Sequence, residues 1–177
     1  MSTTVNARFM AEHRKYAEGF PEVGGMMHVV PVTLLPHMKI YRFATAGKAS
    51  DSNYLYAAAW WFGWSAHEAL VQLAKAERRA LREVARECLA VPPEWGNAMD
   101  VVVAARVKQP LSVWSGTPRA ARRKDLDTQR YGQKWDPDRS ITQLYVAGLS
   151  EFRPDRTRGD CIPWSDVLIP DLLETAG

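Results

Sequence analysis

The sequence has few cysteines, no long apolar run and no signal peptide, and each shortage excludes a class of protein. Its two cysteines, Cys88 and Cys161, form no disulfide framework, which favours a reducing compartment. No stretch approaches the roughly 18 consecutive apolar residues of a membrane-spanning helix. The N-terminus lacks the apolar core of a secretory signal. We therefore expect no membrane contact, and a protein that is cytoplasmic or exported by a specialised secretion system.

Metal-binding and nucleophile motifs are also missing. The four histidines are scattered, and His67-Glu68 lacks the second histidine of a zinc-binding helix. Ser65 follows a glycine but is not followed by the second glycine of a nucleophile elbow. Ser65 and Glu68 instead have the spacing of a helix capping box. Paired aspartates at 125–127 and 136–138 are usually turn residues rather than cation ligands. The sequence therefore predicts no metal.

What the chain does contain is an ordinary globular composition. Its 177 residues fit a single domain, 1–177, and 46% hydrophobic with 24% charged residues can build a stable core. The net charge is only +3, but eight Lys and Arg against two Asp lie between residues 106 and 134, a local excess of six. Such a segment can attract nucleic acid, although charge runs are more often solvated loops. We expect residues 115–140 to be a basic, mobile loop, whose candidate nucleic-acid contacts are Arg119, Arg122, Arg123 and Lys124.

The order of elements predicts an α+β domain with a mostly antiparallel sheet and one main helical segment. Residues 1–37 should form a short polar helix or arm and then an extended, proline-punctuated segment. A helix should begin at Ser65 and stop before Pro92, with an interruption at residues 77–78. Strands are expected at residues 38–44, 54–64, 100–116 with a bend at Pro110, 141–149, and 161–169 as an edge strand.

The segment NYLYAAAWWFGW, residues 53–64, places six aromatic side chains in twelve positions. In a strand, alternation would put Tyr54, Tyr56, Trp60, Phe62 and Trp64 on one face. That face is either ordinary core packing, which aromatic clusters often provide, or the wall of a cleft. We expect both, with one or two of these rings lining a cleft beside Arg42.

Arg42 lies in a mostly apolar strand and alternates onto the face of Ile40 and Ala44. A buried arginine needs an anionic partner, because an unpaired buried charge is very costly. That partner is either a carboxylate such as Glu68 or Glu94, or an anionic group of a ligand held by the guanidinium fork.

The stretch Tyr41-Arg42-Phe43 resembles the first strand of the ADP-ribosyltransferase superfamily, whose strand arginine holds NAD, and the order of elements is similar over residues 38–149. LYAAAWWFGWSAHEALVQL is similar to the tyrosine strand and following helix of the RES-domain NAD-degrading toxins. The resemblance implies an ADP-ribosyltransferase-like toxin or effector that cleaves the nicotinamide–ribose bond, with a macromolecular acceptor and a neutralising partner protein. It also implies that Arg42, Tyr56 and Trp60 bind NAD, with Tyr56 stacking on nicotinamide, and that Glu68 orients the ribose.

This chain departs from the family pattern at two places. The Ser-Thr-Ser element of many arginine-type transferases is absent, and Gln143 stands nearest the usual position of the catalytic glutamate. Gln143 can bond a ribose hydroxyl but cannot supply the negative charge that stabilises an oxocarbenium-like transition state. Gln143 and Glu68 are therefore the candidate catalytic residues, and we expect weak or absent turnover of bound NAD.

Two interpretations from other classes stay open. The chain is alternatively a non-catalytic protein-interaction module, or a nucleic-acid-binding protein that uses the basic 115–140 loop. The resemblance requires that the strand face shared by Gln143, Ile141 and Tyr145 borders the Arg42 cleft. If Gln143 lies on the opposite side of the sheet from Arg42, the interaction module is the better interpretation.

Overall fold

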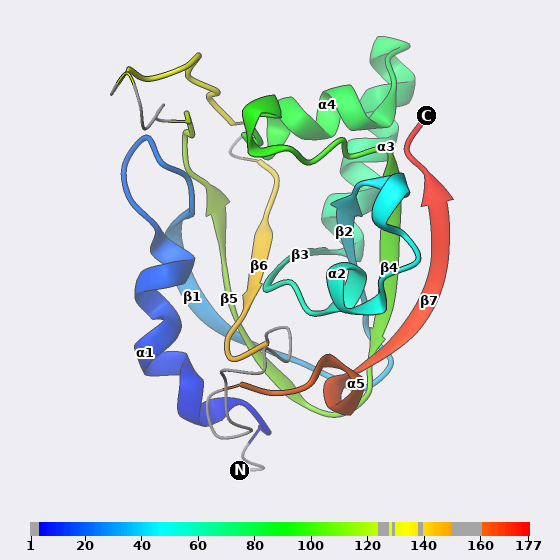
Figure 1. The fold of residues 1–177 in the computed structure, drawn as a ribbon. Helices are drawn as coiled ribbons and strands as arrows, with labels where there is room; N and C mark the ends of the chain where they lie inside the picture. Colours follow the sequence, from blue (N-terminus) through cyan, green and yellow to red (C-terminus); the bar gives the residue numbers. More distant parts are fainter. Residues whose placement is uncertain (1–3, 124–127, 129, 138–139, 150–160) are drawn as a thin grey trace.

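The computed structural model describes residues 4–123, 128, 130–137, 140–149 and 161–177, and the structural statements below concern these residues. They form a single α+β domain with an antiparallel sheet (Figure 1), as the sequence predicts. The strands are β1 (Met26–Leu34), β2 (Lys39–Ala44), β3 (Trp60–Gly63), β4 (Val101–Val107), β5 (Leu111–Pro118), β6 (Gln143–Val146) and β7 (Leu168–Thr175). The helices are α1 (Ala7–Glu18), α2 (Ser52–Tyr56), α3 (Trp64–Glu77), α4 (Leu81–Cys88) and α5 (Trp164–Val167), with 3₁₀ turns η1 (Ala46–Lys48) and η2 (Pro93–Trp95).

Two long chain segments pair with each other and bend together. β1 pairs with β5 and β2 pairs with β4, so residues 26–44 run antiparallel to residues 101–118. Both segments turn between their two strands, and Pro110 lies at the turn between β4 and β5. The bend separates one half of the sheet (β1, β5, β6) from the other half (β2, β4, β7).

The short strand β3 joins the two halves, in the strand order β1-β5-β6-β3-β2-β4-β7. Its first two residues, Trp60 and Trp61, pair with β6, and its last two, Phe62 and Gly63, pair with β2. β3 is therefore joined to β6 by two residue pairs and to β2 by two residue pairs. Beyond these pairs the two halves of the sheet separate.

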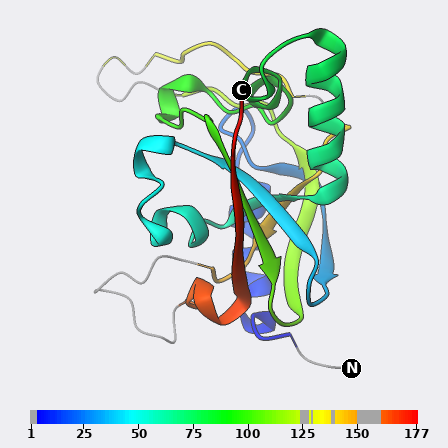
Figure 2. The same ribbon diagram turned by 90° about the vertical axis from the view of Figure 1, so that its right-hand side faces the viewer.

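Three apolar clusters stabilise this arrangement. The largest fills the space between the halves and includes Ile40, Trp61 and Val103, each at most 2% exposed. A second cluster packs β2 and β4 against α3 and α4, and a third packs β1, β5 and β6 against α1. Figure 2 shows β2, β4 and β7 between α3 on one side and η1 and α2 on the other.

The N-terminal segment belongs to this core. Asn6 is fully buried, and its amide donates to the carbonyls of Ser112 and Ala147 at 2.6 and 2.9 Å. Its side-chain oxygen accepts from the Ser112 amide at 2.8 Å. Because a buried amide must be fully paired, these bonds fix the start of α1 to the end of the sheet. β1 follows as an edge strand, a position that tolerates Pro31.

The prediction of one strand over residues 54–64 is wrong. The side chain of Asp51 accepts hydrogen bonds from the backbone N–H groups of Asn53 and Tyr54 at 2.9 and 3.2 Å, which caps α2. Only residues 60–63 remain extended. The local cap therefore overrides the aromatic residues' preference for strands.

The predicted start of the long helix is also corrected. α3 begins at Trp64 with Gly63 as its N-cap, so Ser65 is not the cap, and no side chain caps this end. The predicted interruption is confirmed, because α3 ends at Glu77 and Arg78 adopts a left-handed conformation with φ 54°. α4 then begins at Leu81.

The chain after residue 110 is more regular than expected. β5 continues to Pro118, and Ala121 forms bridges with Val23 and Trp135, so the loop does not begin at residue 115. Lys124 and the other residues of 124–127, 129 and 138–139 lie outside the described residues. The edge strand expected at 161–169 is β7 instead, because residues 164–167 form α5.

Candidate functional site

A cavity of about 450 Å³ opens where β2 and β3 separate, within the size range of small-molecule sites. Arg42 and Arg119 are the charged residues among its described lining, which contains no Asp or Glu. The cavity therefore favours an anionic ligand. Its lining comes from the end of α1, the α1–β1 loop, the sheet and the α4–β4 loop: Tyr16, Gly19, Phe20, Val23, Gly24, Gly25, Arg42, Ala58, Trp60, Leu89, Ala90, Val91, Trp95, Asn97, Arg119 and Gln143.

The backbone of α2 holds the head of Arg42. Its Nη1 donates to the carbonyls of Tyr54 and Leu55 at 2.6 and 2.8 Å. The guanidinium carbon also lies 5.7 Å from the ring centroid of Tyr54 and 5.9 Å from that of Trp61, both within cation–π range. Because the guanidinium is a planar fork, fixing one nitrogen orients the whole group. The missed helix α2 therefore positions the arginine that the sequence singled out.

Trp60 and Gln143 lie in the same cavity as Arg42. Trp60 is 37% exposed and meets Tyr145 edge-on, with 5.0 Å between ring centroids. Gln143 places Nε2 3.5 Å from the carbonyl oxygen of Leu89. The prediction that Arg42 shares a cavity with a ring of the aromatic segment is confirmed for Trp60.

Gln143 and Arg42 reach this cavity from opposite faces of the pleat. By alternation, Gln143 follows the face of Phe62 and of its partner Tyr41, whereas Arg42 points to the other face. Both line the cavity because the sheet opens between β2 and β3 at this level. The expectation that Gln143 lies on the same side of the sheet as Arg42 is therefore wrong by alternation, although both residues line the same cavity.

Tyr56 and Glu68 are not among the residues that line this cavity. Tyr56 is 5% exposed in α2, with its ring 5.0 Å from that of Trp164, and burial raises the pKa of its hydroxyl. Glu68 lies on α3, which covers the other face of β2, with Oε1 3.5 Å from Nδ1 of His67. The structure therefore brings three of the five predicted site residues together and separates these two.

Arg119 also lines the cavity. From the sequence it was predicted to contact nucleic acid, because it lies in a basic run. Nε donates to the carbonyl of Glu18 at 3.2 Å and Nη2 to that of Met26 at 3.3 Å. Its backbone N–H donates to the carbonyl of Gly25 at 2.8 Å. The two side-chain bonds turn the guanidinium inward, and the backbone bond fixes Arg119 to the α1–β1 loop. This contact was not predicted from the sequence, and the Gly24-Gly25 pair is the sequence feature that could have indicated a close backbone approach here.

The loop at residues 19–25 forms one wall of the cavity and passes very close to the end of α1. A Cβ on Gly25 would lie 2.4 Å from the carbonyl oxygen of Glu18, and its φ of +100° suits glycine alone. A Cβ on Gly24 would lie 3.0 Å from Cη2 of Trp95, so this ring packs directly on the loop.

Substituting Gly25 by alanine is expected to destabilise the protein by about 1–3 kcal/mol, because the new methyl group forces the loop away from α1. For a chain of this length, that corresponds to a fall in Tm of about 3–10 °C, measurable by circular dichroism. Gly47→Ala is the matched control, since nothing lies within 4 Å of a Cβ there. Equal effects of both substitutions would show that loop 19–25 is not tightly packed.

The neighbouring wall, the α4–β4 loop, is held by Arg86. Its Nη1 donates to the Val91 carbonyl at 3.1 Å and its Nη2 to the Asn97 carbonyl at 2.8 Å. Burial lowers the pKa of the guanidinium, which still has a carbonyl acceptor on each terminal nitrogen. This arginine therefore positions the loop that carries Trp95.

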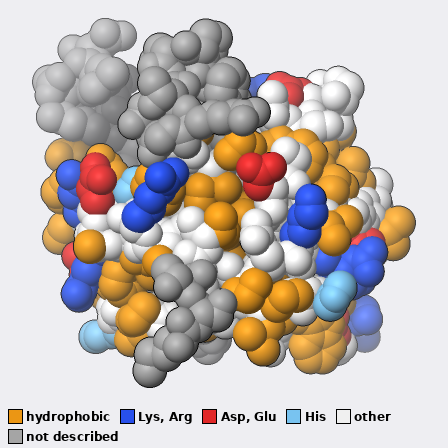
Figure 3. All heavy atoms as spheres, turned by 90° about the horizontal axis from the view of Figure 1, so that it is seen from below, with side chains coloured by type: hydrophobic (Ala, Val, Ile, Leu, Met, Phe, Trp, Pro, Cys, Tyr) orange, Lys and Arg blue, Asp and Glu red, His pale blue; other side chains and the backbone are white. Residues whose placement is uncertain are grey.

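The remaining described basic side chains at the start of the predicted loop also contact the protein. Arg122 pairs with Glu22 and lies 4.0 Å from the ring centroid of Tyr131, and Arg123 donates to the Glu94 carbonyl. On the lower face of the molecule, the described basic side chains stand among hydrophobic and acidic ones (Figure 3). Arg122 and Arg123 themselves contact the α1–β1 loop through Glu22 and η2 through Glu94, two elements that contribute to the cavity lining.

Purified protein is expected to show no measurable binding to single-stranded or duplex DNA at low salt, because these arginines already have internal partners. Fluorescence anisotropy with labelled oligonucleotides measures this. If binding occurs, and the double substitution Arg122→Gln with Arg123→Gln weakens it and flattens its salt dependence, the nucleic-acid interpretation is correct.

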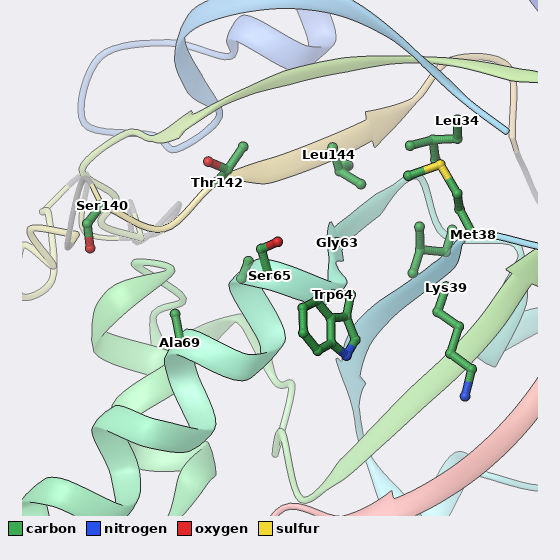
Figure 4. A pocket seen from close by; sticks show the side chains of 12 residues that line it. Leu34, Met38, Lys39, Gly63, Trp64, Ser65, Ala69, Ser140, Thr142 and Leu144 are labelled. Atoms are coloured by element: carbon green, nitrogen blue, oxygen red, sulfur yellow. The ribbon is translucent and has the colours of Figure 1, made fainter.

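A second cavity of about 630 Å³ lies between the start of α3, the start of β2 and β6 (Figure 4). Apolar side chains such as Leu34, Ile40, Trp64 and Leu144 dominate its described lining. Lys39 supplies the one charge in that lining, and its Nζ lies 3.2 Å from Oδ2 of Asp171. The described lining contains no carboxylate or imidazole for acid–base chemistry, and its one ammonium already contacts Asp171.

Two solved structures, each a complex of two proteins, match this chain. A chain of the structure of Rhs1-CT in complex with its cognate immunity protein RhsI1 matches with a TM-score of 0.51 and 18% identity, over 96% of this chain and 96% of that chain. A chain of the structure of Tne2 in complex with Tni2 gives a TM-score of 0.46 and 9% identity, over 89% of this chain and 98% of that chain. No family model and no curated protein matches the sequence. The first similarity shows a shared fold.

None of the described helices has the length and apolarity needed to cross a membrane. Within the same described residues, no three His, Cys, Asp or Glu side chains gather as a metal-binding group.

Proposed function

We propose that the chain binds NAD in the Arg42 cavity and acts as an NAD-cleaving toxin or effector of the ADP-ribosyltransferase type. The observation that carries the proposal is that Arg42, Trp60 and Gln143, from three different strands, line one cavity without a described carboxylate. A guanidinium fork matches a diphosphate, an indole face can stack on nicotinamide, and a carboxamide can bond ribose hydroxyls.

The reaction breaks the bond between ribose C1′ and the nicotinamide nitrogen. The bonding electrons leave with the nitrogen, which neutralises the positive charge of the pyridinium ring. Water or an acceptor nucleophile then bonds to C1′ and loses a proton. The protein contributes positioning and electrostatic preorganisation and needs no covalent nucleophile. Gln143 would orient a ribose hydroxyl, and turnover is expected to be slow because its amide is neutral.

The toxin part of the proposal is supported by the complex of Rhs1-CT with its cognate immunity protein. A chain of that complex shares this fold over nearly the whole length of both chains. We therefore infer that this chain also has a neutralising partner protein. A macromolecular acceptor for ADP-ribose remains part of the proposal.

Incubation of the purified protein with NAD tests the proposal directly. We expect a rise in Tm, because a ligand at a concentration 100 times its Kd stabilises the folded state by about 2.7 kcal/mol. Slow release of nicotinamide should be detectable by chromatography. A protein-interaction module without a nucleotide site would show neither a shift in Tm nor nicotinamide release at millimolar NAD.

A further inference from the structure

Besides Arg42, the cavity contains Arg119, which has no described carboxylate as its partner. Arg119 is fixed by the carbonyls of Glu18 and Met26 through Nε and Nη2, while its Nη1 makes no hydrogen bond with any described residue. The adjacent Arg122, in contrast, forms an ion pair with Glu22. An arginine held in this way at a cavity wall presents a preoriented donor to an anionic group.

Beside Arg119 the cavity wall carries aromatic side chains that are open to solvent. Trp95 is 47% exposed and Phe20 is 71% exposed, yet both line the cavity. The Trp95 ring is held on one side by its contact with Gly24, as the close approach of Cη2 shows. A fixed, solvent-facing indole is a suitable platform for a heterocyclic base.

The cavity therefore contains two pairs of side chains, and each pair consists of one arginine and one tryptophan. Arg42 and Trp60 come from β2 and β3, whereas Arg119 directly follows β5 and Trp95 belongs to η2. One pair would serve a mononucleotide, which has one base and one phosphate. Two pairs match a dinucleotide, which has two heterocycles joined through a diphosphate.

We propose that Arg119 and Trp95 form a separate subsite for the adenosine diphosphate end of a dinucleotide, an inference that rests on the proposed NAD function. Arg119 bonds the adenosine-side phosphate, and the adenine ring stacks on Trp95. The Arg42 end then holds the nicotinamide riboside together with its own phosphate. The specificity of the cavity for a dinucleotide over a mononucleotide is thus set by residues of the predicted basic loop and of η2.

Calorimetric titration with ADP and with nicotinamide mononucleotide, used as separate probes on the full chain, tests this subsite. Trp95→Ala should weaken ADP binding about 5- to 100-fold, the loss expected for one stacked base. Arg119→Gln should weaken ADP binding about 10- to 100-fold, the loss expected for a charged hydrogen bond. Neither substitution should change binding of nicotinamide mononucleotide by more than about twofold, since the two ends are independent. Lys134→Gln, which removes a charge from the same chain segment outside the cavity lining, should affect neither probe.

The two probes separate failure of the subsite from failure of the proposed function. If ADP does not bind, or if Trp95→Ala weakens both probes equally, the subsite is wrong even when nicotinamide mononucleotide binds. If ADP binds and depends on Arg119 and Trp95, but NAD and nicotinamide mononucleotide do not bind, the subsite is a nucleotide site and the NAD function is wrong. Trp95→Ala keeps the test valid if Arg119→Gln does not fold, because Trp95 is exposed and its side chain makes no hydrogen bond with a described residue.

Discussion

NAD binding by the Arg42→Ala protein is expected to fall about 10- to 100-fold, because a hydrogen bond from a charged donor contributes about 1.5–3 kcal/mol. The substitution also removes the two bonds to the α2 carbonyls, so Tm should fall as well. Calorimetric titration with NAD, at a temperature where the variant is folded by circular dichroism, measures the first effect.

Lys39→Gln is the matched control for Arg42. It removes one positive charge from the same strand, but Lys39 does not line the Arg42 cavity. Arg42→Lys keeps the charge and loses the planar fork, so it should bind NAD with intermediate affinity. A folded Arg42→Ala protein with unchanged NAD affinity, or an equal loss in Lys39→Gln, would remove the arginine from the proposed site.

Replacing Gln143 by glutamate is expected to raise the rate of nicotinamide release about 100- to 1,000-fold, the range that a single preorganised group contributes to charge stabilisation. The new carboxylate would face the positive charge that develops on the ribose. The gain should disappear in acid, because a protonated carboxyl is neutral. Release is measured by chromatography under saturating NAD.

Gln143→Leu is the control for shape without hydrogen bonding. It should weaken NAD binding modestly and give no increase in release. The substitution to glutamate also removes the Nε2 donor near the Leu89 carbonyl, so its Tm must be compared with that of the native protein. If Gln143→Glu binds NAD and releases no more nicotinamide, a missing charge at this position is not what limits turnover.

Periodicity and β-branched residues were enough to predict the α+β class and the approximate places of most strands. They did not predict α2, because the aromatic residues of 54–56 favour strands and the deciding interaction is the Asp51 cap. The same missed helix supplies the carbonyls that orient Arg42. An error in one local element thus concealed the contacts of the best-predicted site residue.

The sequence predicted which side chains share a face of a strand more reliably than it predicted which residues lie close together in space. Alternation along residues 141–146 correctly separated Gln143 from Leu144, which is buried in the core between the halves. It could not show that the sheet splits at β3. Arg119 was missed for a similar reason, because the carbonyls of Glu18 and Met26 that turn it inward lie about a hundred positions away in the chain. A run of basic residues in the sequence shows where charge is concentrated, but it does not show which distant carbonyl groups the arginines bind.

The strand order has a consequence for how the chain acquires its structure. β1 and β2 lie near the start of the chain, but their partners β5 and β4 are synthesised only after residue 100. Until then both strands present unpaired edges, and sheets built from such distant pairings generally fold in milliseconds to seconds rather than microseconds. The growing chain is therefore exposed to aggregation through residues 26–44. Slower synthesis at low temperature, or a partner that covers this strand pair early, should increase the yield of native protein.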